Sequence, residues 1–375
     1  MTLRWPFNTK KHKQWVGISL STLAPSAVIY SQEGIVDSVT YNQDQGFEDL
    51  ELWLKKHVSP GMPAVLVLDE ADYELLLVEA PSVPDAELNA AIEFKIGDLL
   101  NQPVEDTAIQ AVRLPSNAYR GRMSMAYVVA CPNNIIKEKV DWASKNHLEI
   151  ETITVPEFSL LNLLAASAIE QGIALLELTP RYGTIRLYQE GALYLTRQVE
   201  VGLDALDIQN DTEQSNDDQV NEEGDEPLLL DEVSLEEATL EETTLDEELV
   251  VDEGLVVDEP ESTLDFNVDS YVGFSPKPKV NAEQTDNLVL EVQRSLDYYE
   301  SQIGMGQVTQ LWVMAGGKDL TPLINAMQSV LTANIEQPNI AEKLKQLTDI
   351  NILHHEHDMN NSVLALGGAL AHVAS

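Results

Sequence analysis

The stretch of sequence that decides the fold occurs twice in the chain. Residues 15–20 read WVGISL and residues 27–36 read AVIYSQEGIV, whereas residues 174–179 read ALLELT and residues 184–193 read TIRLYQEGAL. Each copy predicts an apolar strand, a break, a second strand that ends at a tyrosine and, after Gln-Glu-Gly, a third strand. The Glu-Gly pair predicts a hairpin, because glycine accepts the positive φ that tight hairpins require. A duplicated three-strand meander indicates two related α/β lobes with a cleft between them.

Apolar periodicity predicts further elements between the two meanders. Residues 64–68 are wholly apolar, which is typical of a buried strand in a sheet covered on both faces. Thr154 and Glu157 have the spacing of a capping box, so we expect a helix from this point to about residue 171. The other expected elements are a helix over 48–58 and, in an inserted α/β module, a helix over 85–100, strands over 107–113 and 123–130, a helix over 133–146 and a strand over 147–153.

The C-terminal part returns to an α/β pattern after residue 288. An amphipathic helix is followed by a strand over 308–314 and a further helix. The last apolar element, 362–373, contains Gly367-Gly368. Two glycines in a helix cost about 1 kcal/mol each relative to alanine, and we expect close approach of another backbone to offset that cost.

These elements divide the chain into six parts. They are a basic tail (1–14), a first lobe (15–81), an inserted α/β subdomain (82–155), the first part of a second lobe (156–208), an acidic linker (209–287) and the remainder of the second lobe (288–375).

The negative charge of the chain is concentrated in the acidic linker. Residues 211–269 hold 24 of the 63 Asp and Glu residues and no Lys or Arg, so the rest of the chain has a formal charge of −17 rather than −41. This composition predicts disorder, as a solvated spacer or as a docking tail for a basic partner. A moderately acidic body argues against nucleic acid as a partner.

The overall composition predicts a cytoplasmic protein. The chain has 375 residues and a single cysteine, which fits a reducing compartment. We find no apolar run of the ~18 to 20 residues that span a bilayer and no secretory signal. The basic tail contains Trp5 and Phe7, and its alternatives are a frayed terminus or contact with an anionic membrane surface.

Six short segments carry a resemblance to a known family. They are Val16-Gly17-Ile18, Ile92-Glu93-Phe94 with LLNQPVED at 99–106, AYVVA at 126–130, GALYLTR at 191–197, EVQRSLDYY at 291–299 and Ala315-Gly316-Gly317. In this order they resemble the PilM family of type IV pilus assembly proteins, most of all its members that serve MSHA-type pili. That family belongs to the actin-like (ASKHA) ATPase superfamily, and the resemblance covers about residues 15–207 and 288–373.

The resemblance implies a two-lobed actin-like α/β fold with duplicated meanders. It makes the inserted module the counterpart of subdomain 1C and leaves the acidic linker in place of most of subdomain 2B. It also implies a cytoplasmic scaffold that docks on an inner-membrane platform and binds the cytoplasmic peptide of a bitopic PilN-like protein, together with other platform subunits. The peptide would be added at a sheet edge or laid in a groove of the inserted module and first lobe.

The resemblance further implies a nucleotide cleft, which is degenerate here. In the superfamily, an Asp and, two positions later, a Gly belong to each phosphate loop, where they serve Mg²⁺ and phosphate. They match Ser19 and Ser21 in the first loop, and Glu177 and Thr179 in the second. Only the adenosine-side turn, Gly316-Gly317, keeps its form. We therefore expect no catalytic residue, no metal site and no bound ATP or Mg²⁺.

Two other functions compete with the scaffold. One is an ATP-binding actin-like switch or ATPase in pilus assembly, and the other is a cytoplasmic subunit of a type II secretion platform. The segment His354-His355-Glu356-His357 is interpreted as a polar loop rather than a metal site. Cys131 follows an apolar strand, and we expect it to pack in the core rather than to act as a nucleophile.

Overall fold

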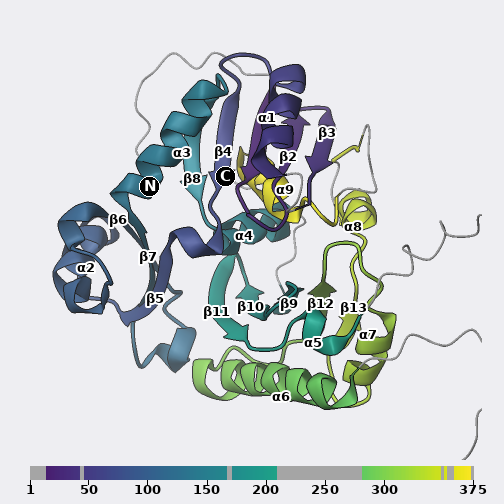
Figure 1. Cartoon of the computed structure of the whole chain (residues 1–375). Coiled ribbons are helices and arrows are strands. Elements are labelled where there is room, and N and C mark those ends of the chain that lie inside the picture. The colour runs from purple at the N-terminus through teal and green to yellow at the C-terminus, as the bar shows by residue number, and fades with distance from the viewer. Residues whose placement is uncertain are drawn as a thin grey trace, which may run out of the picture. The chain divides into compact units, whose positions relative to one another are not determined.

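The computed structural model describes residues 14–42, 46–166, 171–208, 281–347, 350–352 and 359–372 (Figure 1). The chain divides into one unit of Met1–Asn210 with Pro278–Ser375 and a second of Asp211–Lys277. Our expectations for the basic tail, most of the acidic linker and the segment 354–357 fall outside the described residues. Everything below concerns the first unit.

Two five-stranded sheets share one topology, which confirms the duplication. The first has the order β3-β2-β1-β4-β8 and the second the order β11-β10-β9-β12-β13. The strands are β1 (Gln14–Ser19), β2 (Ser26–Ser31), β3 (Gly34–Thr40), β4 (Pro63–Val67), β8 (Glu149–Thr154), β9 (Ile173–Leu178), β10 (Gly183–Gln189), β11 (Ala192–Val199), β12 (Gln310–Met314) and β13 (Asn334–Glu336). Both meanders are antiparallel, and both shift register at the corresponding tyrosine, Tyr30 in one and Tyr188 in the other.

The two hairpins use their glycines differently. In the second copy Gln189 pairs with Ala192, so Glu190 and Gly191 form the turn, with φ of 48° and 73°. In the first copy Ser31 pairs with Gly34, which places the glycine just after the turn. A Cβ on Gly34 would lie 2.0 Å from the carbonyl oxygen of Asn351. Both glycines have the predicted positive φ, 132° at Gly34 and 73° at Gly191, and Gly34 in addition allows a close backbone approach.

The inserted module is built on a third sheet. The residues at which the module begins and ends differ from the prediction. The order of this sheet is β5-β7-β6, with β5 (Glu74–Glu79), β6 (Thr107–Arg113) and β7 (Met125–Pro132). Helix α2 (Leu88–Ile96) buries Ile92 and Ile96 against this sheet. Because β5 belongs to it, the module begins before residue 82.

The module also ends earlier than predicted. Strand β8 belongs to the first lobe, because it pairs in parallel with β4. Helix α3 (Asn133–Lys145) contacts both parts: Ala143 packs in the cluster of β1 and β4, whereas Ile135 and Ile136 pack with Cys131 of β7. Strand partners are set by tertiary contacts, which the periodicity of the sequence does not report, so the sequence did not predict that β8 pairs with β4.

The remaining helices cover the two large sheets. They are α1 (Gly46–His57), α4 (Pro156–Ala166), α5 (Leu203–Leu206), α6 (Ala282–Tyr298), α7 (Thr321–Gln328), α8 (Ile340–Leu347) and α9 (Val363–Ala369). Helix α6 begins at Ala282 with Asn281 as its cap, so the predicted linker end at residue 287 is too late. The first turns of α6 are largely polar, which concealed the start of the helix in the sequence.

Glycines allow α9 to pack closely on its neighbours, α4 and β1 (Figure 1). A Cβ on Gly17 of β1 would lie 1.9 Å from the Ala365 oxygen, and a Cβ on Gly367 would lie 2.1 Å from the Ser159 oxygen of α4. The Ser159 hydroxyl donates a hydrogen bond to the Leu364 oxygen at 2.6 Å. The expectation that another backbone approaches Gly367-Gly368 is confirmed.

The inserted module also contacts the second lobe. The Tyr127 hydroxyl of β7 donates to the Tyr194 oxygen of β11 at 3.2 Å. In the loop before β7, Tyr119, Arg120 and Gly121 all have positive φ, of 53°, 57° and 68°. This backbone directs Arg120 to donate from Nη2 to the Ser301 oxygen, at 3.1 Å, just beyond α6.

Candidate functional site

A cavity of about 670 Å³ lies where the loops of the two lobes meet. Three of the predicted cleft residues, Ser21, Glu177 and Thr179, line it. The other lining residues are Thr22, Leu23, Leu68, Asp69, Glu70, Ala71, Pro156, Pro180, Arg181, Tyr182, Gln198, Asp204 and Leu364.

The hydroxyls of the two predicted phosphate loops bond within their own loops. Ser19 is buried, and its Oγ accepts from the Ser21 backbone N–H at 3.4 Å. Thr179 Oγ1 donates to the Tyr182 oxygen at 2.8 Å and accepts from the Tyr182 N–H at 3.1 Å. These bonds close a turn around Pro180, a residue with no N–H to offer a phosphate.

Gly316 and Gly317 line a different hollow. Both have positive φ, of 52° and 83°, and the Lys318 N–H bonds to the Ala315 oxygen at 3.2 Å, which makes a tight turn between β12 and α7. Their hollow has a volume of about 10 Å³. A volume of this size holds about one water molecule. This hollow shares Gln337, Pro338 and Asn360 with an adjoining cavity of about 400 Å³.

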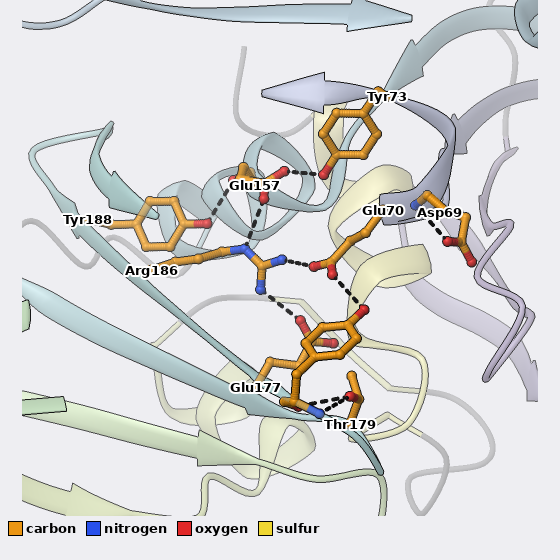
Figure 2. Close-up of polar contacts among 10 residues, drawn as sticks. Asp69, Glu70, Tyr73, Glu157, Glu177, Thr179, Arg186 and Tyr188 are labelled. Carbon is orange, nitrogen blue, oxygen red and sulfur yellow. Dashed lines mark hydrogen bonds and ion pairs between the residues drawn. The ribbon is translucent and has the colours of Figure 1, made fainter. Parts of the chain in front are cut away.

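Beside the large cavity, Arg186 of β10 is surrounded by three carboxylates (Figure 2). Its side chain has no solvent exposure. Nε lies 3.3 Å from Glu157 of α4 and Nη1 lies 2.8 Å from Glu177 of β9, while Nη2 contacts Glu70, which follows β4. The Arg186 cluster, defined as these four residues, therefore joins the first lobe, α4 and the second lobe.

Tyrosine hydroxyls complete the hydrogen bonding of the Arg186 cluster. Tyr73 donates to Glu157 Oε2 at 2.7 Å, and Tyr188 donates to the Glu157 backbone oxygen at 2.9 Å (Figure 2). Tyr182 donates to Glu70 Oε2 at 2.9 Å. Burial, followed by the charge of Glu157, raises the pKa of Tyr73, so this hydroxyl stays protonated and acts as a donor.

The charges of the Arg186 cluster do not balance, because one cation faces three carboxylates. Burial lowers the pKa of Arg186, but the carboxylates outweigh it and hold that pKa well above its ordinary value. Burial raises the pKa of Glu177 against the opposing effect of Arg186. The guanidinium thus supplies the positive charge beside Glu177, the residue that the family resemblance matched to a metal-associated aspartate.

Sequence reasoning named Glu177 but missed Arg186, Glu157 and Glu70. A signal was present, because a lone arginine within the apolar run TIRLY must be buried, and a buried arginine requires anionic partners. Glu157 was assigned to a capping box. In the structure its carboxylate binds Arg186 and Tyr73 instead, and Thr154 belongs to β8. The capping-box prediction was therefore wrong, although a helix does begin at Pro156.

A second cavity, the apolar groove, lies between the inserted module and the first lobe. It measures about 300 Å³ and is lined by Leu68, Ala108, Ile109, Gln110, Val112, Val129, Cys131, Ile136, Ile153, Thr154, Val155 and Phe158. Strand β6 is at the end of its sheet, so one edge pairs with no strand in the described part of the chain. Val112 on β6 is 41% exposed.

Cys131 lies in the wall of the apolar groove and agrees with the packing role expected from the sequence. It is 3% exposed, and burial raises the pKa of its thiol to about 11. A thiol with such a pKa is largely protonated at neutral pH and is a poor nucleophile.

Comparisons with known proteins identify the fold. No protein-family model and no curated protein matches the chain. A solved structure described as the PilM-PilN type IV pilus biogenesis complex is similar over 95% of this chain and 97% of that one, with 14% identity and a TM-score of 0.59. The cytoplasmic domain of EpsL, an inner-membrane component of the type II secretion system of Vibrio cholerae, matches 50% of this chain and 71% of that one, with 16% identity and a TM-score of 0.36.

A Bacteroides thetaiotaomicron protein with an actin-like ATPase fold and unknown function matches 90% of this chain and 97% of that one, with 10% identity and a TM-score of 0.42. The duplicated sheets and the likeness to the PilM-PilN structure show that the fold is actin-like and two-lobed, as predicted. Among the described residues, none forms a helix that is both long and apolar enough to cross a bilayer.

Proposed function

We propose that this chain is a non-catalytic scaffold of type IV pilus biogenesis, of the MSHA type, at the cytoplasmic face of the inner membrane. Its partner is the short cytoplasmic peptide of a bitopic PilN-like protein, and the binding site is the apolar groove. The observation that carries the proposal is the open edge of β6 beside that groove.

The groove suits an extended apolar peptide. No strand pairs with the outer edge of β6, although its Ala111 N–H donates to Asn89 Oδ1 at 2.7 Å and its Ala111 oxygen accepts from Gln110 Nε2 at 3.3 Å. A peptide main chain would displace these side chains or pair with the other N–H and C=O groups of the edge, and the adjoining apolar side chains would accept every second side chain of such a peptide. The lining contains no charged side chain, and Gln110 and Thr154 supply its polar groups. The likeness to the PilM-PilN structure supports a partner of this kind.

The interlobe cavity supports the non-catalytic part of the proposal. The loops that would carry phosphate close on their own hydroxyls, and Arg186 already forms ion pairs with carboxylates that would attract Mg²⁺. The charged residues that line the cavity are Asp69, Glu70, Glu177, Asp204 and Arg181, so acidic side chains outnumber the single basic one and their net charge opposes a triphosphate.

Binding of the tail peptide tests the proposal directly. The probe is a fluorescently labelled peptide with the N-terminal cytoplasmic sequence of the bitopic PilN-like protein encoded beside this chain. We expect saturable binding to the full chain by anisotropy, and at least about tenfold weaker binding to Val112→Arg, because a charge in the groove must be desolvated. Val330→Arg is the matched control, because Val330 is 55% exposed and lies outside the groove. Absence of binding, or equal weakening by both variants, contradicts the proposal.

The competing function is an ATP-dependent switch, favoured by one observation. A cavity of about 670 Å³ is large enough to hold a nucleotide. Calorimetry with Mg-ATP separates the two functions, because binding tighter than ~100 µM requires about 5 to 6 kcal/mol and would favour the switch. For the scaffold we expect no heat of binding at that concentration.

A further inference from the structure

The first turn of α4 forms a wall shared by the apolar groove and the interlobe cavity. Val155 and Phe158 line the groove. Between them in sequence, Pro156 lines the interlobe cavity and Glu157 joins the Arg186 cluster. Leu68, at the end of β4, lines both cavities. Any displacement of this turn therefore changes the shape of both sites.

Three polar contacts with neighbouring side chains converge on Glu157 in this turn, in addition to the bond from Ser159 to the Leu364 oxygen. The Glu157 carboxylate accepts from Arg186 and Tyr73, and its backbone oxygen accepts from Tyr188 (Figure 2). Tyr73 in turn packs on the cluster formed by Leu68, Cys131 and Val155, against which Phe158 also packs. The buried guanidinium of Arg186 is thus connected to the groove wall through its ion pair with Glu157 and the first turn of α4.

We infer that Glu157 and Arg186 are positioning residues for the peptide groove. The ion pair keeps Val155 and Phe158 at the distance from β6 and β7 that leaves the groove narrow and apolar. Loss of that contact frees the turn and opens the groove. The identity of the groove's ligand rests on the proposed function, whereas the positioning role does not.

The chain contains a probe for this role. Cys131 is the single cysteine of the whole sequence, lines the groove and is 3% exposed. Its rate of reaction with a thiol reagent such as dithionitrobenzoate reports how often the groove opens. The full chain can be used without introducing any label.

The decisive comparison is Glu157→Gln against Glu177→Gln. Both remove one carboxylate from the same guanidinium, and each leaves Arg186 with two others. Of the two, only Glu157 lies between the groove-lining Val155 and Phe158, so we expect Glu157→Gln to speed labelling of Cys131 about tenfold, the effect of losing one charged hydrogen bond. We expect Glu177→Gln to label at the wild-type rate.

Tyr73→Phe gives a second, milder test, because it removes only the hydroxyl that bonds to Glu157 at 2.7 Å. It should also speed labelling, because the buried carboxylate loses one of its donors. Wild-type rates in both Glu157→Gln and Tyr73→Phe, or equal acceleration by Glu177→Gln, would overturn the inference.

The tail peptide separates this inference from the proposed function. If the peptide binds the wild-type chain, it should protect Cys131 and bind Glu157→Gln more weakly than Glu177→Gln. If the peptide does not bind, the proposed function fails, while the labelling rates still decide the positioning role.

Discussion

Replacing Arg186 by methionine should destabilise the protein strongly, and most strongly at neutral pH. The change removes the cation and leaves Glu157, whose side chain is 5% exposed, with no positive partner in the Arg186 cluster. Removing one member of a buried ion pair costs about 3 to 5 kcal/mol. Glu177 and Glu70 are 25% and 29% exposed, so water screens them and their added cost is about 1 kcal/mol or less each.

The assay is urea unfolding followed by circular dichroism at pH 7.5 and pH 5. A loss of about 4 kcal/mol in the free energy of unfolding would also lower the thermal melting midpoint by roughly 10 °C. The carboxylates left behind are buried anions, so protonation relieves them and the deficit of Arg186→Met should shrink at pH 5. A deficit below about 1 kcal/mol would refute the reasoning, because exposed ion pairs contribute no more than that. A deficit that is equal at both pH values would refute it as well.

Two further predictions concern packing and titration. Gly367→Ala should cost at least about 3 kcal/mol, since its Cβ would lie 2.1 Å from a backbone oxygen that cannot rotate away. Gly97→Ala, whose Cβ would come no closer than 3.5 Å to any neighbour, should change stability by less than about 1 kcal/mol in the same denaturation assay. Because burial raises the pKa of Glu177, its contribution is greatest below its unfolded pKa and is lost as pH rises through the folded pKa. Glu177→Gln should therefore gain stability relative to wild type between pH 4 and pH 7, and a flat difference across that range would contradict the assignment.

Local sequence predicted those parts of the fold that depend on local geometry. The repeated strand-break-strand pattern was sufficient for both meanders, because strand, turn and register are set within about twenty residues. Gly367 likewise predicted a close helix contact, because a glycine in an apolar helix is unfavourable unless another backbone lies against it.

The sequence did not predict which distant segments meet. Strand β8 looked like part of the inserted module because it follows α3 directly, yet its partner is β4, about 85 residues earlier in the chain. The sequence did not predict the Arg186 cluster for the same reason. The three carboxylates lie 9 to 116 residues from Arg186 in the sequence. The local spacing of Thr154 and Glu157 matched a capping box and therefore gave Glu157 the wrong partner.

The contacts of Arg120 with Ser301 and of Tyr127 with Tyr194 have a mechanical consequence. Two rigid lobes connected by a single contact can rotate about that contact, whereas a second contact at a distance prevents the rotation. Here the lobes are connected by the Arg186 cluster, by the contact of β3 with Asn351, and by the inserted module, which bonds to β11 and to the chain just beyond α6. A force applied to the module is then carried by both lobes together.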